Sequence, residues 1–232
     1  MLWRGPHGGG AASGAIGSMV ASHNKGGQYL RARTTPTNPG TAFQTAVRNA
    51  ITTTSNRWVE TLTPEQRLGW EVYGFNTTFR NRLGDTIQLS GIAAYNRSNS
   101  SRQQAGLAII DDAPVVFDTG DAGTQVSLTL GTNRSSGSPG TVTWAAPAPW
   151  NEAGSNNNML LYISRPQNGS INFFKGPYRL AAVIPGDNSS NASTFAMPFA
   201  TAGDGSKVFF RTTISYEDGR LSSELTDVTF PS

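Results

Sequence analysis

The chain has 232 residues, enough for one large domain or two small ones. Only 14% of the residues are charged. The sequence has no cysteine, and this excludes disulfides, thiolate metal sites and thiol nucleophiles. The two histidines, His7 and His23, both lie near the start, so the rest of the sequence cannot supply a histidine-bearing catalytic triad or a two-histidine metal site. We therefore expect no catalytic, metal-binding or cofactor-binding residues.

The charge is unevenly distributed along the chain. Residues 1–104 carry eleven basic and four acidic residues, a net charge of +7, whereas residues 105–232 carry seven and eleven, a net charge of −4. Fifteen of the 18 basic residues are arginine, whose planar guanidinium suits fixed contacts at interfaces. Two interpretations remain open: a basic half that docks on an acidic partner, and a dipolar protein with ordinary solvated charges.

Membrane and secretion signals are missing from the sequence. The first residues lack the apolar run of a signal peptide, and no stretch approaches the roughly 20 apolar residues of a membrane span. We expect a soluble protein that is made in the cytoplasm and does not bind a membrane.

The N-terminal region predicts an arm followed by a hairpin. Residues 1–18 are rich in glycine and other small residues, which predicts a flexible arm. Strands beginning at Met19 and Tyr29 flank a glycine-containing turn over residues 24–27. Because side chains alternate along a strand, Tyr29, Arg31 and Arg33 share one face, which suits a phosphate, a base or a protein partner.

The following residues predict a small helical unit, so that residues 19–107 form a hairpin plus a helical docking unit. Helical spacing of apolar residues predicts a first helix, on the stripe Phe43, Val47, Ile51 and Trp58. Thr63-Pro64-Glu65-Gln66 is a capping box with proline at the first helical position, so it predicts the start of a second helix. A short strand over 86–89 precedes a third helix, expected to be capped by Ser90, and Trp58 and Trp70 are expected to close a core between the first two helices.

The second half predicts strands separated by turns. Residues 108–123 are expected to form a linker with a first strand at 115–118, and residues 124–232 a β-sandwich domain. Its seven predicted strands span 125–130, 141–145, 159–164, 178–184, 193–197, 207–216 and 225–230. The number of strands and Trp144 in the second predict an immunoglobulin-like or fibronectin type III-like sandwich. The expected fold class is therefore α+β, an N-terminal arm, hairpin and small helical unit followed by an all-β sandwich.

Two acidic segments deserve a chemical interpretation. The aspartates at 111, 112, 118 and 121 could supply calcium ligands, but the twelve-residue loop ending in glutamate is missing, so a solvated linker is the favoured interpretation. Glu217-Asp218-Gly219-Arg220 lies between the last two strands and predicts a hairpin turn rather than a glycosidase carboxylate pair.

Short motifs give the sequence a family resemblance. Three stand near the start: Gly14-x-x-Gly17-Ser18, His23-Asn24-x-Gly26-Gly27-x-Tyr29-x-Arg31-x-Arg33 and Pro36-x-Asn38-Pro39-x-Thr41-x-x-Gln44-x-x-x-Arg48. Others follow at Leu62-Thr63-Pro64-Glu65-Gln66-Arg67-x-x-Trp70, Ser90-Gly91-x-x-Ala94-Tyr95-x-x-x-Asn99, Phe209-x-Arg211 and Glu217-Asp218-Gly219-Arg220. The chain resembles a group of uncharacterised phage-associated bacterial proteins, one branch of which is a domain-of-unknown-function family common in Bacteroidota. This resemblance implies no enzymatic activity and suggests a virion component.

These observations lead to an expected function. We expect a non-enzymatic virion structural protein, a capsid decoration or cement protein that docks on the shell through its N-terminal arm and basic half. The expected partners are the major capsid protein or other virion proteins, with further copies of the chain within the assembly. The expected partner-binding residues are Tyr29, Arg31, Arg33 and Arg48. A neck or tail component, a glycan-binding surface module that uses the sandwich, and the less favoured nucleic-acid binding through the same four residues are the alternatives.

Overall fold

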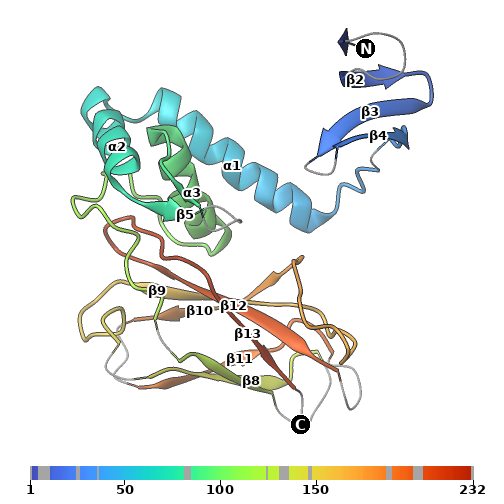
Figure 1. The fold of residues 1–232 in the computed structure, drawn as a ribbon. Helices are drawn as coiled ribbons and strands as arrows, with labels where there is room; N and C mark the ends of the chain where they lie inside the picture. Colours follow the sequence, from blue (N-terminus) through green and yellow to red (C-terminus); the bar gives the residue numbers. More distant parts are fainter. Residues whose placement is uncertain are drawn as a thin grey trace. The chain divides into compact units, whose positions relative to one another are not determined.

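The computed structural model describes residues 2–4, 11–24, 27–35, 37–80, 85–123, 125–130, 136–145, 148–186, 190–200 and 206–230. Within them the fold is α+β and mostly β, with three helices and several antiparallel sheets (Figure 1). The chain divides into two compact units, Met1–Ala42 and Phe43–Ser232. None of the described helices combines the length and the apolar character needed to cross a lipid bilayer.

The N-terminal unit is a four-stranded antiparallel sheet in the order β1-β2-β3-β4. Its strands are β1 (Leu2–Arg4), β2 (Ala11–Ile16), β3 (Met19–Asn24) and β4 (Gly27–Ala32). The predicted hairpin is confirmed as the β3–β4 pair, in which Asn24 faces Gly27; residues 25 and 26 of its turn lie outside the described residues. Strands β1 and β2 lie where the sequence predicts a flexible arm. Strand β1 pairs with β2, and β2 pairs with β3, so the backbone finds hydrogen-bond partners that sequence patterns do not reveal.

Three helices open the second unit: α1 (Ala42–Glu60), α2 (Pro64–Asn76) and α3 (Gly91–Gln104). The capping box that begins α2 is confirmed: Thr63 Oγ1 accepts from the Gln66 amide, and the Gln66 side chain accepts from the Thr63 amide. Ser90 lies at the N-cap of α3 but makes no side-chain cap hydrogen bond. The short strands β5 (Phe79–Arg80) and β6 (Thr86–Ile87) pair between α2 and α3.

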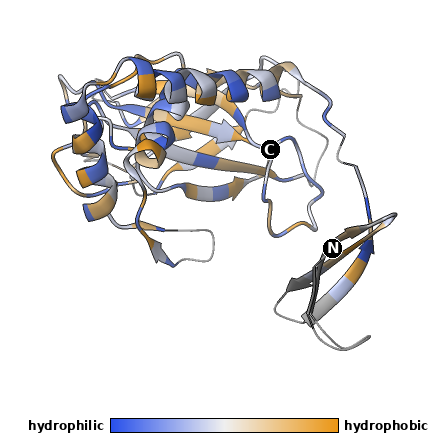
Figure 2. Cartoon of the chain, turned by 90° about the horizontal axis from the view of Figure 1, so that it is seen from above, coloured by the Kyte–Doolittle hydropathy of each residue, from blue (hydrophilic) through white to orange (hydrophobic). Residues whose placement is uncertain are grey.

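The predicted apolar stripe of α1 is partly wrong. Ile51 is 47% exposed, whereas Ala50 and Thr54 are buried. Phe43, Val47 and Trp58 of the predicted stripe are half-buried, and Ala50 and Thr54 continue this face in place of Ile51. Figure 2 shows hydrophilic and hydrophobic residues alternating along the helices, as expected for helices that lie on a core with one face only.

An aromatic core holds the helices together. Trp70, Tyr73 and Tyr95 are almost completely buried. The Tyr95 ring lies 5.4 Å from Trp70 and 5.5 Å from Trp58, centroid to centroid. The predicted core between the first two helices is therefore confirmed, but it closes through Tyr95 of α3, which contacts both tryptophans.

Seven strands form two further antiparallel sheets. A three-stranded sheet has the order β11-β8-β7, and a four-stranded sheet has the order β10-β9-β12-β13. The strands are β7 (Ser127–Leu130), β8 (Pro139–Thr143), β9 (Asn158–Ile163), β10 (Arg179–Pro185), β11 (Ala192–Ala196), β12 (Val208–Ser215) and β13 (Leu225–Thr229). Leu128 and Val142 of the first sheet share one hydrophobic core with Leu161, Phe210 and Ile214 of the second. Each of the seven strands predicted over residues 124–232 is confirmed to within two residues at either end.

The helices cover the other face of the four-stranded sheet (Figure 1). Leu160 and Tyr162 of β9 point away from the shared core and pack with Leu107, which follows α3. At another point of contact, the Arg179 guanidinium lies 4.5 Å from the centroid of the Phe43 ring on α1. Strand β9 is therefore covered on both faces.

The strand predicted at Val115–Asp118 is wrong. These residues have no regular structure, and Val115 is 85% exposed. The segment instead runs beside α2, where Trp70 Nε1 donates to the Asp111 carbonyl and the Tyr73 hydroxyl to the Asp118 carbonyl. Side chains of α2 therefore hold the chain at Asp111 and Asp118, and no described strand pairs with the residues between them.

Candidate functional site

The predicted partner-binding residues lie in both units. Tyr29 and Arg31 are exposed on one face of β4, since side chains alternate along the strand. Arg33 follows β4, and its amide donates to the Ser18 carbonyl at 2.7 Å. Arg48 is exposed on α1 and belongs to the second unit. The structure therefore brings Tyr29, Arg31 and Arg33 to one strand and its extension, whereas Arg48 lies on a helix of the second unit.

A hollow of about 540 Å³ lies in the second unit. It is formed by the segment after α3, the start of β9 and the turn between the last two strands. Its lining residues are Asp118, Thr119, Gly120, Asp121, Pro149, Asn157, Tyr216, Glu217, Asp218 and Arg220. The acidic segments of the sequence, interpreted as a linker and a turn, meet here.

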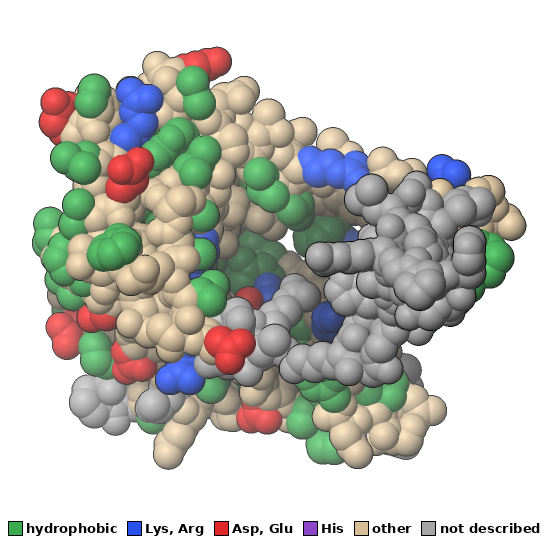
Figure 3. All heavy atoms as spheres, turned by 45° about the horizontal axis from the view of Figure 1, so that its top comes forward, with side chains coloured by type: hydrophobic (Ala, Val, Ile, Leu, Met, Phe, Trp, Pro, Cys, Tyr) green, Lys and Arg blue, Asp and Glu red, His purple; other side chains and the backbone are tan. Residues whose placement is uncertain are grey.

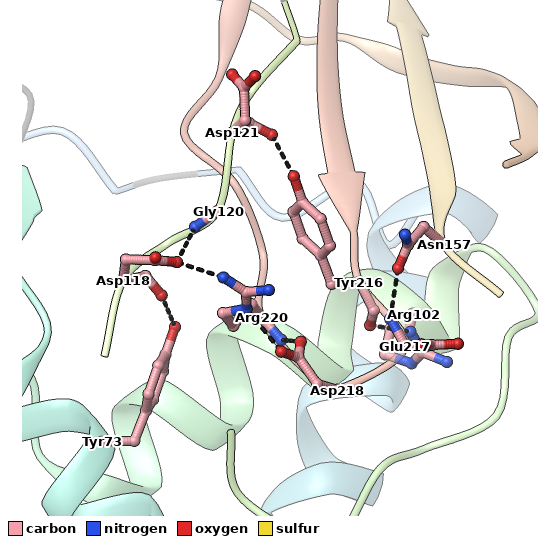
Figure 4. A network of polar contacts seen from close by, with 10 residues as sticks. All are labelled: Tyr73, Arg102, Asp118, Gly120, Asp121, Asn157, Tyr216, Glu217, Asp218 and Arg220. Atoms are coloured by element: carbon pink, nitrogen blue, oxygen red, sulfur yellow. Dashed lines mark hydrogen bonds and ion pairs between the residues drawn. The ribbon is translucent and has the colours of Figure 1, made fainter. Parts of the chain in front are cut away.

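Arg220 is the central cation of this hollow (Figure 4). Its Nη1 donates to Asp118 Oδ1 at 2.5 Å and its Nε to Asp218 Oδ2 at 2.7 Å. The guanidinium also lies 4.8 Å from the centroid of the Tyr216 ring. Burial alone would lower the pKa of Arg220, but the hydrogen bonds and charges of the two aspartates outweigh burial and raise it.

Hydrogen bonds also hold Asp121, Asn157 and Glu217, three further polar residues of the hollow. Asp121 Oδ1 accepts from the Gly123 amide, and the Asp121 carbonyl accepts from the Tyr216 hydroxyl at 2.8 Å. Asn157 Oδ1 accepts from the Glu217 amide, and the Glu217 carboxylate accepts from Asn156. Gly219 has φ +93° in the turn, which confirms the turn predicted over 217–220.

Two arginines of α3 fasten the helical layer to the same turn. Arg102 donates from Nη1 to Ser215 Oγ at 2.8 Å and from Nε to the Ala108 carbonyl at 2.7 Å. Arg97 donates to the carbonyls of Leu221 and Ser222, at 2.6 and 2.9 Å. Burial lowers the pKa of both guanidiniums, whose hydrogen-bond acceptors here are uncharged.

We use the name joint for Arg220 with its two aspartates and for the contacts of Arg97 and Arg102 beside them. Asp118 and Asp218 are occupied by Arg220, and burial raises the pKa of Tyr73, which donates to the Asp118 carbonyl, to about 12. Tyr73 is therefore a hydrogen-bond donor at neutral pH and is unsuited to act as a base. Within the described parts of the chain, no group of three or more His, Cys, Asp or Glu residues could hold a metal ion.

An apolar stripe on α2 is a second feature of this unit. Leu68, Val72 and Phe75 follow helical spacing and are 61%, 39% and 65% exposed. Figure 3 shows hydrophobic side chains at the surface over the part of the molecule where α2 lies. Exposed apolar residues gathered in this way are typical of surfaces that bind other proteins.

The sequence indicated the exposed residues of β4 but not the joint. Arg97 and Arg102 gave no signal because their acceptors at Leu221 and Ser215 lie more than 100 residues further along the chain. An arginine within a helix otherwise predicts a solvated face. The sequence matches no known protein-family model and no curated protein.

Proposed function

We propose that this chain is a non-enzymatic structural protein of a phage-like particle, a capsid decoration or cement protein. It docks on the major capsid protein or another virion protein through its N-terminal unit and its basic half, and its place is the virion. The family resemblance of the N-terminal motifs supports this proposal, as does the architecture of that unit.

The construction of the N-terminal sheet carries the proposal. Among the side chains of residues 1–42 that the structure describes, Ala21 alone is a buried hydrophobic residue. Met19, Tyr29 and Leu30 are 47%, 40% and 62% exposed. A sheet needs a covered hydrophobic face to be stable in water. Since the described side chains of this sheet are mostly exposed, the sheet is best explained as an element that becomes covered on assembly.

The second unit supports the same role. We propose that its seven strands are a fibronectin type III-like sandwich, which favours a rigid, outward-facing module. The strands divide into the sheets β11-β8-β7 and β10-β9-β12-β13, and β10 lies beside β9 at the edge of the second sheet. This is the strand arrangement expected of that fold. The paired charges of its hollow favour a structural joint over a reaction site, and the apolar stripe Leu68, Val72 and Phe75 offers another surface for contacts within a particle.

The test is the copy number of this protein in purified particles, measured by quantitative mass spectrometry against the major shell protein. A ratio near one is expected for a decoration protein. About six to twelve copies per particle would place the protein at the neck or tail, where symmetry sets low copy numbers. Absence from particles would refute the proposal.

A matched pair of variants tests the docking surface. Arg31→Glu on β4 is expected to reduce incorporation into particles about tenfold or more, since a reversed charge at an interface opposes association. Lys175→Glu makes the same change of charge at an exposed position of the second unit and is expected to leave incorporation unchanged. Equal incorporation of the two variants would remove Arg31 from the interface.

A glycan-binding surface is the second candidate function, favoured by one exposed aromatic residue. Phe173 is 79% exposed and Phe230 is 59% exposed. Lys207 Nζ donates to the Ile171 carbonyl at 3.1 Å, near Phe173 in the chain, and lies 5.7 Å from the centroid of the Phe230 ring. Binding to a glycan array that is lost in Phe173→Ala would support this function over the virion proposal.

A further inference from the structure

Strand β4 lies at the edge of the N-terminal sheet, and no described strand pairs with its outer side. The amide of Arg33 donates to the Ser18 carbonyl, which continues the β3–β4 register by one pair. In an antiparallel pair the backbone groups of successive residues alternate between the two sides. Gln28, Leu30 and Ala32 therefore direct their amides and carbonyls outward, away from β3.

An edge of this kind pairs readily with another strand. Its side chains limit which strand that is. A parallel, in-register pairing of two β4 strands is unfavourable, because the two Arg31 guanidiniums would face one another. Among antiparallel arrangements of two copies, pairing centred on Arg31 has the same defect. Pairing centred on Tyr29 sets Arg31 opposite Gly27, so the Arg31 side chain gains no cross-strand side-chain partner.

Pairing centred on Leu30 has neither defect. Leu30 then exchanges hydrogen bonds with Leu30 of the second copy, and Gln28 with Ala32. Tyr29 faces Arg31 of the second copy, and this contact occurs twice by symmetry. A guanidinium beside a tyrosine ring is attractive, and cross-strand pairs of this kind stabilise sheets.

We propose that the β4 edges of two copies of this chain pair antiparallel about Leu30 and join their N-terminal sheets into one continuous sheet. The proposal rests on the proposed function only in taking the N-terminal sheet as the assembly element. It names the partner of that edge as a second copy of the chain. The sheet so formed has a two-fold axis that passes between the two Leu30 residues.

A single-cysteine scan of the full chain tests this register, because the native sequence has no cysteine. Leu30→Cys places two thiols on residues about 5.5 Å apart, Cα to Cα, which is within the range of a disulfide. Ala32→Cys is the matched control, since its two copies would lie roughly 14 Å apart along the strands. Leu30 is 62% exposed, so its replacement removes little buried area from the fold.

The expected result is a disulfide-linked dimer of Leu30→Cys that forms about tenfold or more faster than that of Ala32→Cys under mild oxidation. Faster linkage of Tyr29→Cys or Arg31→Cys than of Leu30→Cys would overturn the proposal, since those positions mark the other two registers. Equal, slow linkage at all four positions would overturn it as well. In sedimentation, Leu30→Asp is expected to shift a wild-type dimer towards the monomer, because two carboxylates would meet at the two-fold axis. A wild-type protein that is monomeric at every concentration would refute the pairing.

These measurements use purified protein, without particles. Failure of the pairing therefore leaves the copy number in particles as an independent result, and absence from particles leaves the dimer as another.

Discussion

Replacing Trp70 by alanine tests whether the aromatic core supports the helical layer. The indole is completely buried, its ring centroid lies 5.7 Å from that of Tyr73, and Nε1 donates to the Asp111 carbonyl at 2.8 Å. A tryptophan buries about 200 Å² of surface, and at about 25 cal/mol per Å² this corresponds to about 5 kcal/mol. The alanine methyl retains a little of this, while the new cavity and the lost hydrogen bond act against folding. We expect the free energy of unfolding to fall by about 4 kcal/mol.

Equilibrium unfolding in urea, followed by far-ultraviolet circular dichroism, measures this change. In thermal unfolding, the melting temperature is expected to fall by about 8–16 °C in a unit of this size. Phe75→Ala on the same helix is the matched control: the ring is 65% exposed, so the change in unfolding free energy should stay within about 0.5 kcal/mol. A loss below about 1 kcal/mol for Trp70→Ala would refute the assignment of the aromatic cluster as the support of this layer.

Two further predictions concern the same layer. Hydrogen bonds from Arg57 of α1 lower the pKa of Asp111. The Asp111 carboxylate therefore stabilises the fold at neutral pH, and this stabilisation is lost as the pH falls through the lowered pKa. Asp111→Asn should therefore lower the free energy of unfolding by about 1 kcal/mol at pH 7. In urea titrations this difference from wild type should shrink below about pH 4, and a difference independent of pH would contradict the prediction. Gly74→Ala should lower the melting temperature despite the better helix propensity of alanine, because its Cβ would lie 2.4 Å from the Leu89 carbonyl oxygen. Gly69→Ala, whose Cβ would meet only the Ala113 methyl at 3.1 Å, should have a smaller effect, and equal melting temperatures would contradict the close approach.

The regular elements of the second unit could be predicted from the sequence because local signals agree with the final structure. Val208, Phe210 and Ile214 stand at even positions and share one face of β12, as the two-residue period of a strand predicts. Thr63 and Gln66 specify the start of α2 by hydrogen bonds within four residues.

Elements without such local signals could not be predicted. Strand β2 consists mostly of small residues and exists through its pairing with β3. The apolar run at Val115–Phe117 has the composition of a strand, but no described strand pairs with it, and the carbonyls of Asp111 and Asp118 on either side accept from side chains of α2. Similarly, the joint at Arg220 assembles segments that only the tertiary fold brings together.

The fastening of α3 also bears on how the protein is made. Arg102 and its acceptor Ser215 are separated by 113 residues, and Arg97 and Leu221 by 124. At about 5–20 residues per second, the ribosome delivers the end of β12 roughly 6–23 seconds after α3. During that interval the guanidiniums remain solvated and the outer face of β9 lacks its finished cover. The helical layer therefore attains its contacts with β12 and the following turn only after their synthesis, and a stalled or prematurely terminated chain would present an incomplete apolar sheet to chaperones and proteases.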